Sequence, residues 1–248
     1  MATWVSHLAV ADKILERLPW LHRREFCVGN IAPDCNVENS DFTSFSPPRE
    51  VTHWMGASAK SLGDGERFLA EFVAPKEPLE AKEASFLLGY YAHLVTDAEY
   101  RSFTRDGERL RAAFARISSC PALCEKALGM AKDWETVKAL IPKEERLRDV
   151  YAMEKKYLEL HPRSGYITEI LPLEEFPDYI SYLPHGAVLR KIKVLGYMPK
   201  EEKSKFPYIA ISEQEYKQFL DKAAETAVNG ILSYKSRRRT DSCPREKL

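Results

Sequence analysis

The chain has 248 residues, enough to bury a sizeable hydrophobic core in one large domain or two small ones. Apolar residues make up 44% of it and charged residues 30%, a balance that excludes wholesale disorder. Lys plus Arg and Asp plus Glu number 37 each, so the formal net charge is zero. This argues against a generally basic protein that binds nucleic acid or membrane surfaces through its overall charge.

The sequence predicts neither a signal peptide nor a transmembrane helix. Residues 1–18 lack the pattern of a signal peptide, and no apolar run reaches the roughly 20 residues of a membrane-spanning helix. The five cysteines are an odd number without a CxxC pair, as is usual for reduced thiols. We therefore expect a cytoplasmic protein without a transmembrane segment.

Helical periodicity begins near the N-terminus. Residues 6–18 place apolar side chains on one stripe with charged ones largely opposite, which predicts an amphipathic helix. A second short helix is expected over residues 21–28, ending at Gly29-Asn30. Residues 31–48 are polar, contain three prolines and have no period, so they predict a long loop of the kind that is often functional.

The same periodicity predicts further helices at residues 51–74, 80–103, 107–117, 122–140 and 143–160, of which 80–103 is the strongest. Residues 161–210 contain six prolines and only short apolar runs, which indicates loops with a short strand or helix. Ser212 and Glu215 form a capping-box pattern that opens a last helix to about Tyr234.

These elements predict an all-α fold: a compact multi-helix bundle with a less regular C-terminal part. We expect residues 1–160 to form the main helical domain. Residues 161–234 should add an irregular segment and a final helix packed on the same domain, and residues 235–248 a basic flexible tail.

His93 and Asp97 carry the first indication of chemistry. They lie four residues apart in the strongest predicted helix, so both side chains leave the same face and can bind one ion. Their neighbours are apolar, so the pair should be buried, and a buried imidazole and carboxylate need partners. A His–Asp hydrogen bond or a pair on the helix surface fits the same spacing without metal.

Three other residues are candidates for the same site. His53 lies in an apolar Thr-His-Trp segment, Asp34 ends a Gly-Asn-Ile-Ala-Pro-Asp turn, and His7 begins the first helix. Each has a plainer interpretation, as a core histidine, a turn aspartate or a neighbour of the helix cap. Imidazole and carboxylate ligands together suit zinc and related divalent ions.

Other aromatic and histidine side chains have mainly structural interpretations. A set of aromatic residues favours core packing over a pocket for lipid or nucleobases: Trp20, Trp54, Tyr90 and Tyr91. His22, beside two arginines, is expected at the surface, and His161 and His185, each beside a proline, in loops.

The candidate residues resemble a known family when they are taken in order. Trp4 and His7, the turn that ends at Asp34, the Thr-His-Trp segment and the His-x-x-x-Asp helix follow one another at compatible separations. In this combination they resemble the zinc-dependent phospholipase C family, which shares its all-α fold with the fungal single-strand nucleases. The resemblance covers about residues 1–105.

This resemblance implies a zinc cofactor of one or two ions in a metal site between helices, so that residues 1–160 would be a helical metal-binding domain. Asp34, His53, His93 and Asp97 would hold one ion, and Asp97 would bridge to a second ion that His7 also binds. Asp34 is in addition the catalytic candidate, as a general base for the attacking water. The implied activity is metal-assisted hydrolysis of a phosphodiester or phosphoester.

Two departures from the family pattern keep an alternative open. Trp4 is internal, whereas the secreted enzymes use an N-terminal Trp to hold the second ion. No His occurs between His93 and His161, so the histidines of a third ion site are missing. The alternative function is a metal-binding or non-catalytic relative that acts as a structural or interaction module.

The expected partner is a phosphoester-containing substrate, a lipid headgroup among the candidates. Nucleic acid is less favoured, because zero net charge supplies no general basic surface. Phosphohydrolases that use an adjacent His-Asp pair are disfavoured, since none of the six histidines is followed by Asp. The oligomeric state is left open.

Overall fold

The structure, a computed structural model, describes residues 2–39, 41, 43–56, 63–76, 78–200 and 202–241. In these residues it is mainly helical, which confirms the all-α prediction. The longer helices are α1 (Trp4–Arg17), α2 (Arg23–Gly29), α5 (Ala81–Arg105), α6 (Gly107–Ser118), α8 (Trp134–Leu140), α9 (Lys143–Leu160), α10 (Ala187–Leu195) and α11 (Glu213–Asp241). None of the described helices is both long enough and apolar enough to cross a membrane.

Short elements connect these helices. The helical ones are η1 (Ala32–Asp34), α3 (Arg49–Thr52), α4 (Gly65–Phe68), η2 (Leu69–Val73), η3 (Ala74–Lys76), α7 (Pro121–Cys124) and η4 (Tyr166–Ile170). The expected loop 31–48 also contains a small antiparallel hairpin of β1 (Val37–Glu38) and β2 (Phe45–Ser46), in which Val37 lies opposite Ser46.

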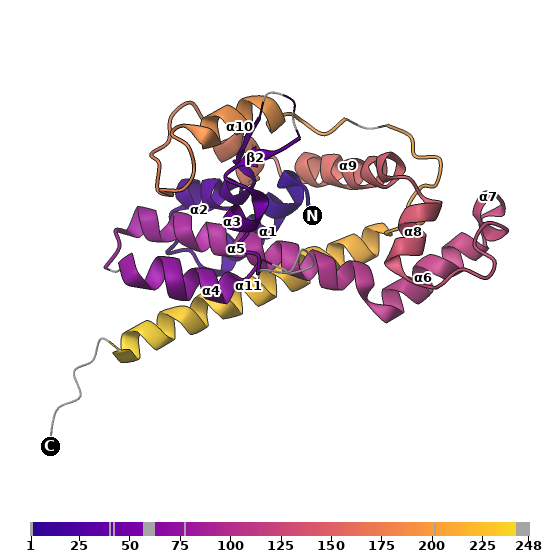
Figure 1. Cartoon of the computed structure of the whole chain (residues 1–248), viewed down its shortest axis with the longest axis horizontal. Coiled ribbons are helices and arrows are strands. Elements are labelled where there is room, and N and C mark those ends of the chain that lie inside the picture. The colour runs from indigo at the N-terminus through magenta and orange to yellow at the C-terminus, as the bar shows by residue number, and fades with distance from the viewer. Residues whose placement is uncertain are drawn as a thin grey trace, which may run out of the picture.

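The helix α5 lies at the centre of the fold. It packs against α2 and α11, and α11 also packs along α1. Figure 1 shows α5 and α11 crossing the lower half of the view, α9 and α10 above them, and α6, α7 and α8 gathered at one end. The apolar side chains buried between these elements form one cluster that includes residues from Ala2 to Tyr234.

Two glycines bring α2 and α5 into backbone contact. A Cβ atom on Gly29 would lie 2.0 Å from the carbonyl oxygen of Phe86, and one on Gly89 would lie 2.1 Å from that of Phe26. Only glycine permits so close an approach. The contact sets Asn30, the residue after α2, directly against the face of α5 that carries His93.

Two predicted helices are shorter than expected. In the range 51–74, α3 ends at Thr52 and Trp54 has a positive φ of 51°, a left-handed conformation that a helix cannot continue; residues 57–62 lie outside the described part. In the range 122–140, Gly129 has a φ of 75°, and α8 starts only after Asp133, whose side chain accepts a hydrogen bond from the Thr136 amide at 2.8 Å.

The C-terminal part contains more helix than its prolines indicate. The apolar runs near residues 166 and 188 form η4 and α10, and η4 packs on α2. The capping box is confirmed: the Ser212 amide donates to Glu215 Oε2 at 2.7 Å, and the Glu215 amide donates to Ser212 Oγ at 3.2 Å. The helix α11 continues to Asp241, past its expected end at Tyr234, and residues 242–248 lie outside the described part.

Candidate metal centre

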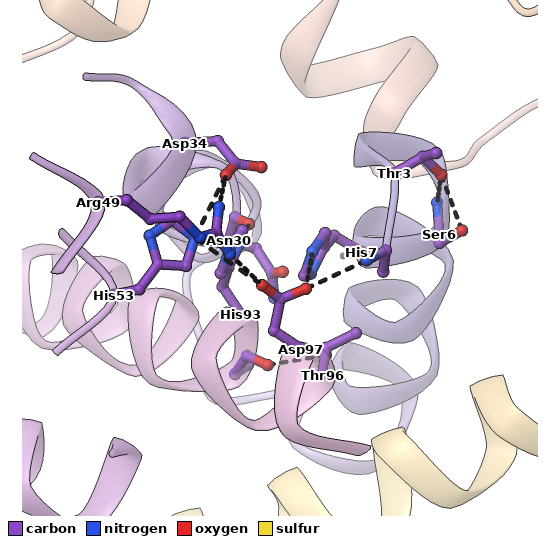
Figure 2. A network of polar contacts seen from close by, with 12 residues as sticks. Thr3, Ser6, His7, Asn30, Asp34, Arg49, His53, His93, Thr96 and Asp97 are labelled. Atoms are coloured by element: carbon purple, nitrogen blue, oxygen red, sulfur yellow. Dashed lines mark hydrogen bonds and ion pairs between the residues drawn. The ribbon is translucent and has the colours of Figure 1, made fainter. Parts of the chain in front are cut away.

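The five residues predicted to form a site come from four segments and meet beside α5. His93 and Asp97 lie on α5, His7 on α1, Asp34 at the end of η1, and His53 directly after α3. Figure 2 shows these side chains converging. The three histidines are at most 2% exposed and both carboxylate side chains are 12% exposed, so the cluster is almost fully shielded from water.

The protonation of His93 follows from its hydrogen bond to the backbone. Its Nδ1 lies 2.8 Å from the carbonyl oxygen of Asn30, which can only accept, so Nδ1 carries the proton. Burial, and next the neighbouring His7, lower the pKa of His93 to about 3, although Asp34 and Asp97 act in the opposite direction. His93 is therefore neutral at neutral pH, with the lone pair of Nε2 turned into the cluster.

His53 presents its Nε2 to the same point. Its Nδ1 lies 2.9 Å from Thr52 Oγ1, whose own proton points to the Arg49 carbonyl oxygen at 3.4 Å. In the tautomer with its proton on Nδ1, His53 donates to Thr52 Oγ1 and its Nε2 is free to accept; in the other tautomer Nε2 donates to Asp34 Oδ1. The Nε2 atoms of His53 and His93 are 3.3 Å apart. In the first of these tautomers two lone pairs face each other at this distance and repel unless a metal ion lies between them.

The two carboxylates surround this point. Asp34 Oδ1 lies 3.3 Å from His53 Nε2. Asp97 divides its oxygens between two histidines, with Oδ1 3.6 Å from His7 Nε2 and Oδ2 3.8 Å from His53 Nε2. Asp97 therefore contacts imidazoles on both sides of the cluster.

Both carboxylates are held in their charged form. Burial by itself raises the pKa of a carboxyl group. For Asp34 this effect is outweighed by His93 and by the hydrogen bond from His53, so the pKa is below its ordinary value. The pKa of Asp97 is lowered well below its ordinary value by its contacts with His7 and His93, again against burial. Buried negative charge of this kind needs a cation nearby.

Several buried polar atoms in the cluster have no hydrogen-bond partner among the described residues. Both ring nitrogens of His7 and both side-chain amide atoms of Asn30 are of this kind. Because buried polar atoms are nearly always hydrogen-bonded, such a group indicates a ligand or ordered water in the site. The structure thus contains donor atoms that a bound ion would satisfy.

The donor set and its spacing fit a zinc ion. Two groups of three residues, which share His93, have ligand atoms that all lie within 4.8 Å of one another: His7, His93 and Asp97, and Asp34, His53 and His93. Ligand atoms each about 2 Å from a zinc ion lie at separations of this order. The hydrogen bonds on the Nδ1 atoms of His53 and His93 are the kind that fixes a metal-binding tautomer.

Sequence reasoning missed Arg49. Its Nη2 lies 2.8 Å from Asp97 Oδ2 and its Nη1 3.6 Å from Asp34 Oδ1, so one guanidinium group joins the two carboxylates. The signal was present, because Arg49 and His53 are four residues apart, as His93 and Asp97 are, and so lie on one face of a helical turn. Asn30 was also missed, because it contacts His93 through its backbone carbonyl, a group that every residue has.

The remaining candidates lie elsewhere. Trp4 begins α1 and is buried in the core. His22, His161 and His185 are exposed; His161 stacks on Tyr157, and His185 pairs with Asp178.

The four aromatic residues expected in the core differ in burial. Tyr90 and Tyr91 are buried, and Trp54 is half-buried against Phe68 and Phe72. Trp20 is 41% exposed, so the expectation is wrong for this residue. Trp20 lies instead under the Lys235 ammonium group at the surface.

The segment that holds the cluster is the segment that matches a known family. Residues 6–99 match the family described as zinc dependent phospholipase C. The match confirms the resemblance seen in the sequence and contains all five cluster residues, from His7 to Asp97. Neither the curated proteins nor the solved structures gave a match to the chain.

Proposed function

We propose that this protein is a zinc-dependent hydrolase of phosphodiesters or phosphoesters. The observation that carries the proposal is the pair of facing Nε2 atoms of His53 and His93, enclosed by two charged carboxylates in a shielded cluster. The match of the surrounding segment to the zinc-dependent phospholipase C family supports zinc as the ion. Asp34, His53, His93 and Asp97 would hold the first ion, and His7 with Asp97 a second.

The chemistry that zinc supplies when bound is polarisation of a phosphoester and activation of a water molecule. The chain's part is to arrange the reactants. Asn30 and Thr52 fix the orientation of His93 and His53 through their Nδ1 atoms. Asp34 contacts His53 and Arg49 through Oδ1, and Figure 2 shows its second oxygen directed away from these contacts. We assign to that oxygen the task of accepting a proton from the attacking water.

The substrate class follows from charge as well as from family. The cluster holds two carboxylates and one guanidinium group, and a divalent ion would make it net positive, which favours an anionic phosphate. The family match favours a phospholipid headgroup over nucleic acid. The free thiols of Cys27 and Cys35, both buried, support a cytoplasmic protein.

A non-catalytic metal-binding module is the second candidate. It is favoured by the absence of any His between His93 and His161, which leaves the ligand set smaller than that of the enzymes the chain resembles. Such a protein would bind zinc in the same cluster and use it to stabilise the fold.

The two functions are separated by metal content and turnover. The purified protein is assayed for zinc by elemental analysis, then for hydrolysis of bis(p-nitrophenyl) phosphate and for headgroup release from phosphatidylcholine vesicles. We expect at least one zinc ion per chain and turnover that is lost with a chelator and restored by zinc. Stoichiometric zinc without turnover of either substrate would establish the module instead, and a protein that binds no zinc would contradict both.

A further inference from the structure

We propose that Arg49 is a two-position cation: it neutralises Asp34 and Asp97 when no metal is bound, and it binds the substrate phosphate when metal is bound. The inference rests on the proposed function, because it assigns a role in the same site. It concerns a residue that lies outside the five candidate ligands and that touches both carboxylates.

Arg49 occupies the carboxylate oxygens that a metal ion would use. Its guanidinium group contacts Asp97 Oδ2 and Asp34 Oδ1. These are the same two oxygens that face His53 Nε2, at 3.8 Å and 3.3 Å. A divalent ion placed among them would be repelled by a guanidinium group at hydrogen-bond distance. Occupation by metal therefore favours displacement of Arg49.

The Arg49 side chain has space to move away from the carboxylates toward solvent. Its side chain is 33% exposed, whereas both carboxylates are 12% exposed and His53 is nearly fully buried. Arg49 also begins α3, a helix of a single turn, and its side chain borders solvent. Among the residues of the cluster it is thus the one placed between the carboxylates and the outside.

The guanidinium group of Arg49 is chemically suited to bind phosphate. The planar fork of guanidinium N–H groups matches the oxygens of a phosphate group, and arginine keeps its charge at any physiological pH. Once released from the carboxylates, Arg49 would lie at the entrance of a positively charged centre. A phosphate approaching the ion would meet its guanidinium group first.

The test measures binding of two probes, zinc and inorganic phosphate, to the whole protein and to Arg49→Met. Loss of a competing, partly exposed ion pair should tighten zinc binding by about two- to fivefold. Loss of a charge-assisted hydrogen bond should weaken phosphate binding to the zinc-loaded protein by about tenfold or more. Arg49→Lys keeps the charge without the fork and should fall between the parent and Arg49→Met for phosphate.

The control is Arg111→Met, which makes the same chemical change at an exposed arginine on α6 that pairs only weakly with Glu108. It should change neither affinity, and circular dichroism of each variant verifies that the fold is retained. Weaker zinc binding in Arg49→Met would show that Arg49 orients the carboxylates rather than competing for them, which overturns the proposal. Unchanged phosphate affinity would overturn it as well. A parent protein that binds no zinc would instead refute the proposed function, so the two failures are distinguishable.

Discussion

The imidazole rings of His7 and His93 are stacked, with centroids 3.9 Å apart and planes within 2° of parallel. The stack joins α1 to α5, and it directs the Nε2 atom of His7 toward Asp97 Oδ1 at 3.6 Å. His7 thus contacts only Oδ1 of Asp97, while Oδ2 contacts His53 and Arg49. The cluster therefore has two halves that meet at Asp97, and each can be tested separately.

Loss of a residue common to the cluster should remove all bound metal. We expect His93→Ala or Asp97→Ala to abolish zinc binding, measured by elemental analysis, and to lower the melting temperature of the zinc-loaded protein, because ligand binding to the native state stabilises it. His22→Ala, a change at an exposed histidine, is the matched control and should keep full occupancy. Full zinc content in His93→Ala would place the metal elsewhere.

Loss of His7 should affect only the second half of the cluster. If Asp97 bridges two ions, His7→Ala should bind one zinc ion per chain where the parent protein binds two, with little change in affinity for the remaining ion. The stoichiometry is read from a zinc titration by calorimetry. A single ion in the parent protein would show that the bridged pair does not form.

The backbone contact between α2 and α5 should be essential for the geometry of His93. In Gly29→Ala the added Cβ would lie 2.0 Å from the Phe86 carbonyl oxygen, so α2 must move and take the Asn30 carbonyl from His93. We expect a loss of about 2 kcal/mol or more in the free energy of unfolding, measured by urea denaturation.

The control for this change is Gly107→Ala on α6, where the nearest atom to the added Cβ is the end of the Arg111 side chain at 3.6 Å. That variant should differ from the parent by less than about 1 kcal/mol. Equal effects at the two glycines would contradict the role given to the α2–α5 contact.

A buried carboxyl group outside the cluster should make stability depend on pH. Glu154 on α9 is 1% exposed, and its Oε1 accepts hydrogen bonds from the amide and hydroxyl of Ser6, at 3.0 Å and 2.8 Å, and from the Thr3 hydroxyl. Burial raises its pKa to about 7 from an ordinary value of 4.5, although these hydrogen bonds lower it. Since the folded protein holds this proton more tightly than the unfolded chain, the stabilisation is complete below pH 4.5 and is lost as the pH rises toward 7.

The expected slope for one such group is at most about 1.4 kcal/mol per pH unit inside this window. Glu154→Gln removes the titration, so its free energy of unfolding, measured by urea denaturation at several pH values, should fall less than that of the parent between pH 4.5 and 7. Identical pH profiles for the two proteins would show that Glu154 does not carry the shift.

The local sequence predicted much of the helical framework. The helices α1, α2, α5, α6 and α9 follow from apolar periodicity, and the start of α11 from the pair Ser212 and Glu215, because these signals arise from neighbours within a few residues. The boundaries of α3 and α8 were missed, since a left-handed Trp54 and the break at Gly129 are not marked by a loss of periodicity. The helix α11 extends past its predicted end for the opposite reason: its last residues are polar, so the apolar periodicity stops before the helix does.

For the candidate site, the sequence alone determined which side chains have metal-binding chemistry, and for His93 and Asp97 that they share a helical face. The tertiary structure decided that His7, Asp34 and His53 lie beside them, because that depends on α1, η1 and α3 folding against α5. It also decided the protonation of His93 through the Asn30 carbonyl and the position of Arg49 between two carboxylates. These contacts join residues up to 90 positions apart in the chain. Local sequence patterns do not predict how residues so far apart are arranged in space.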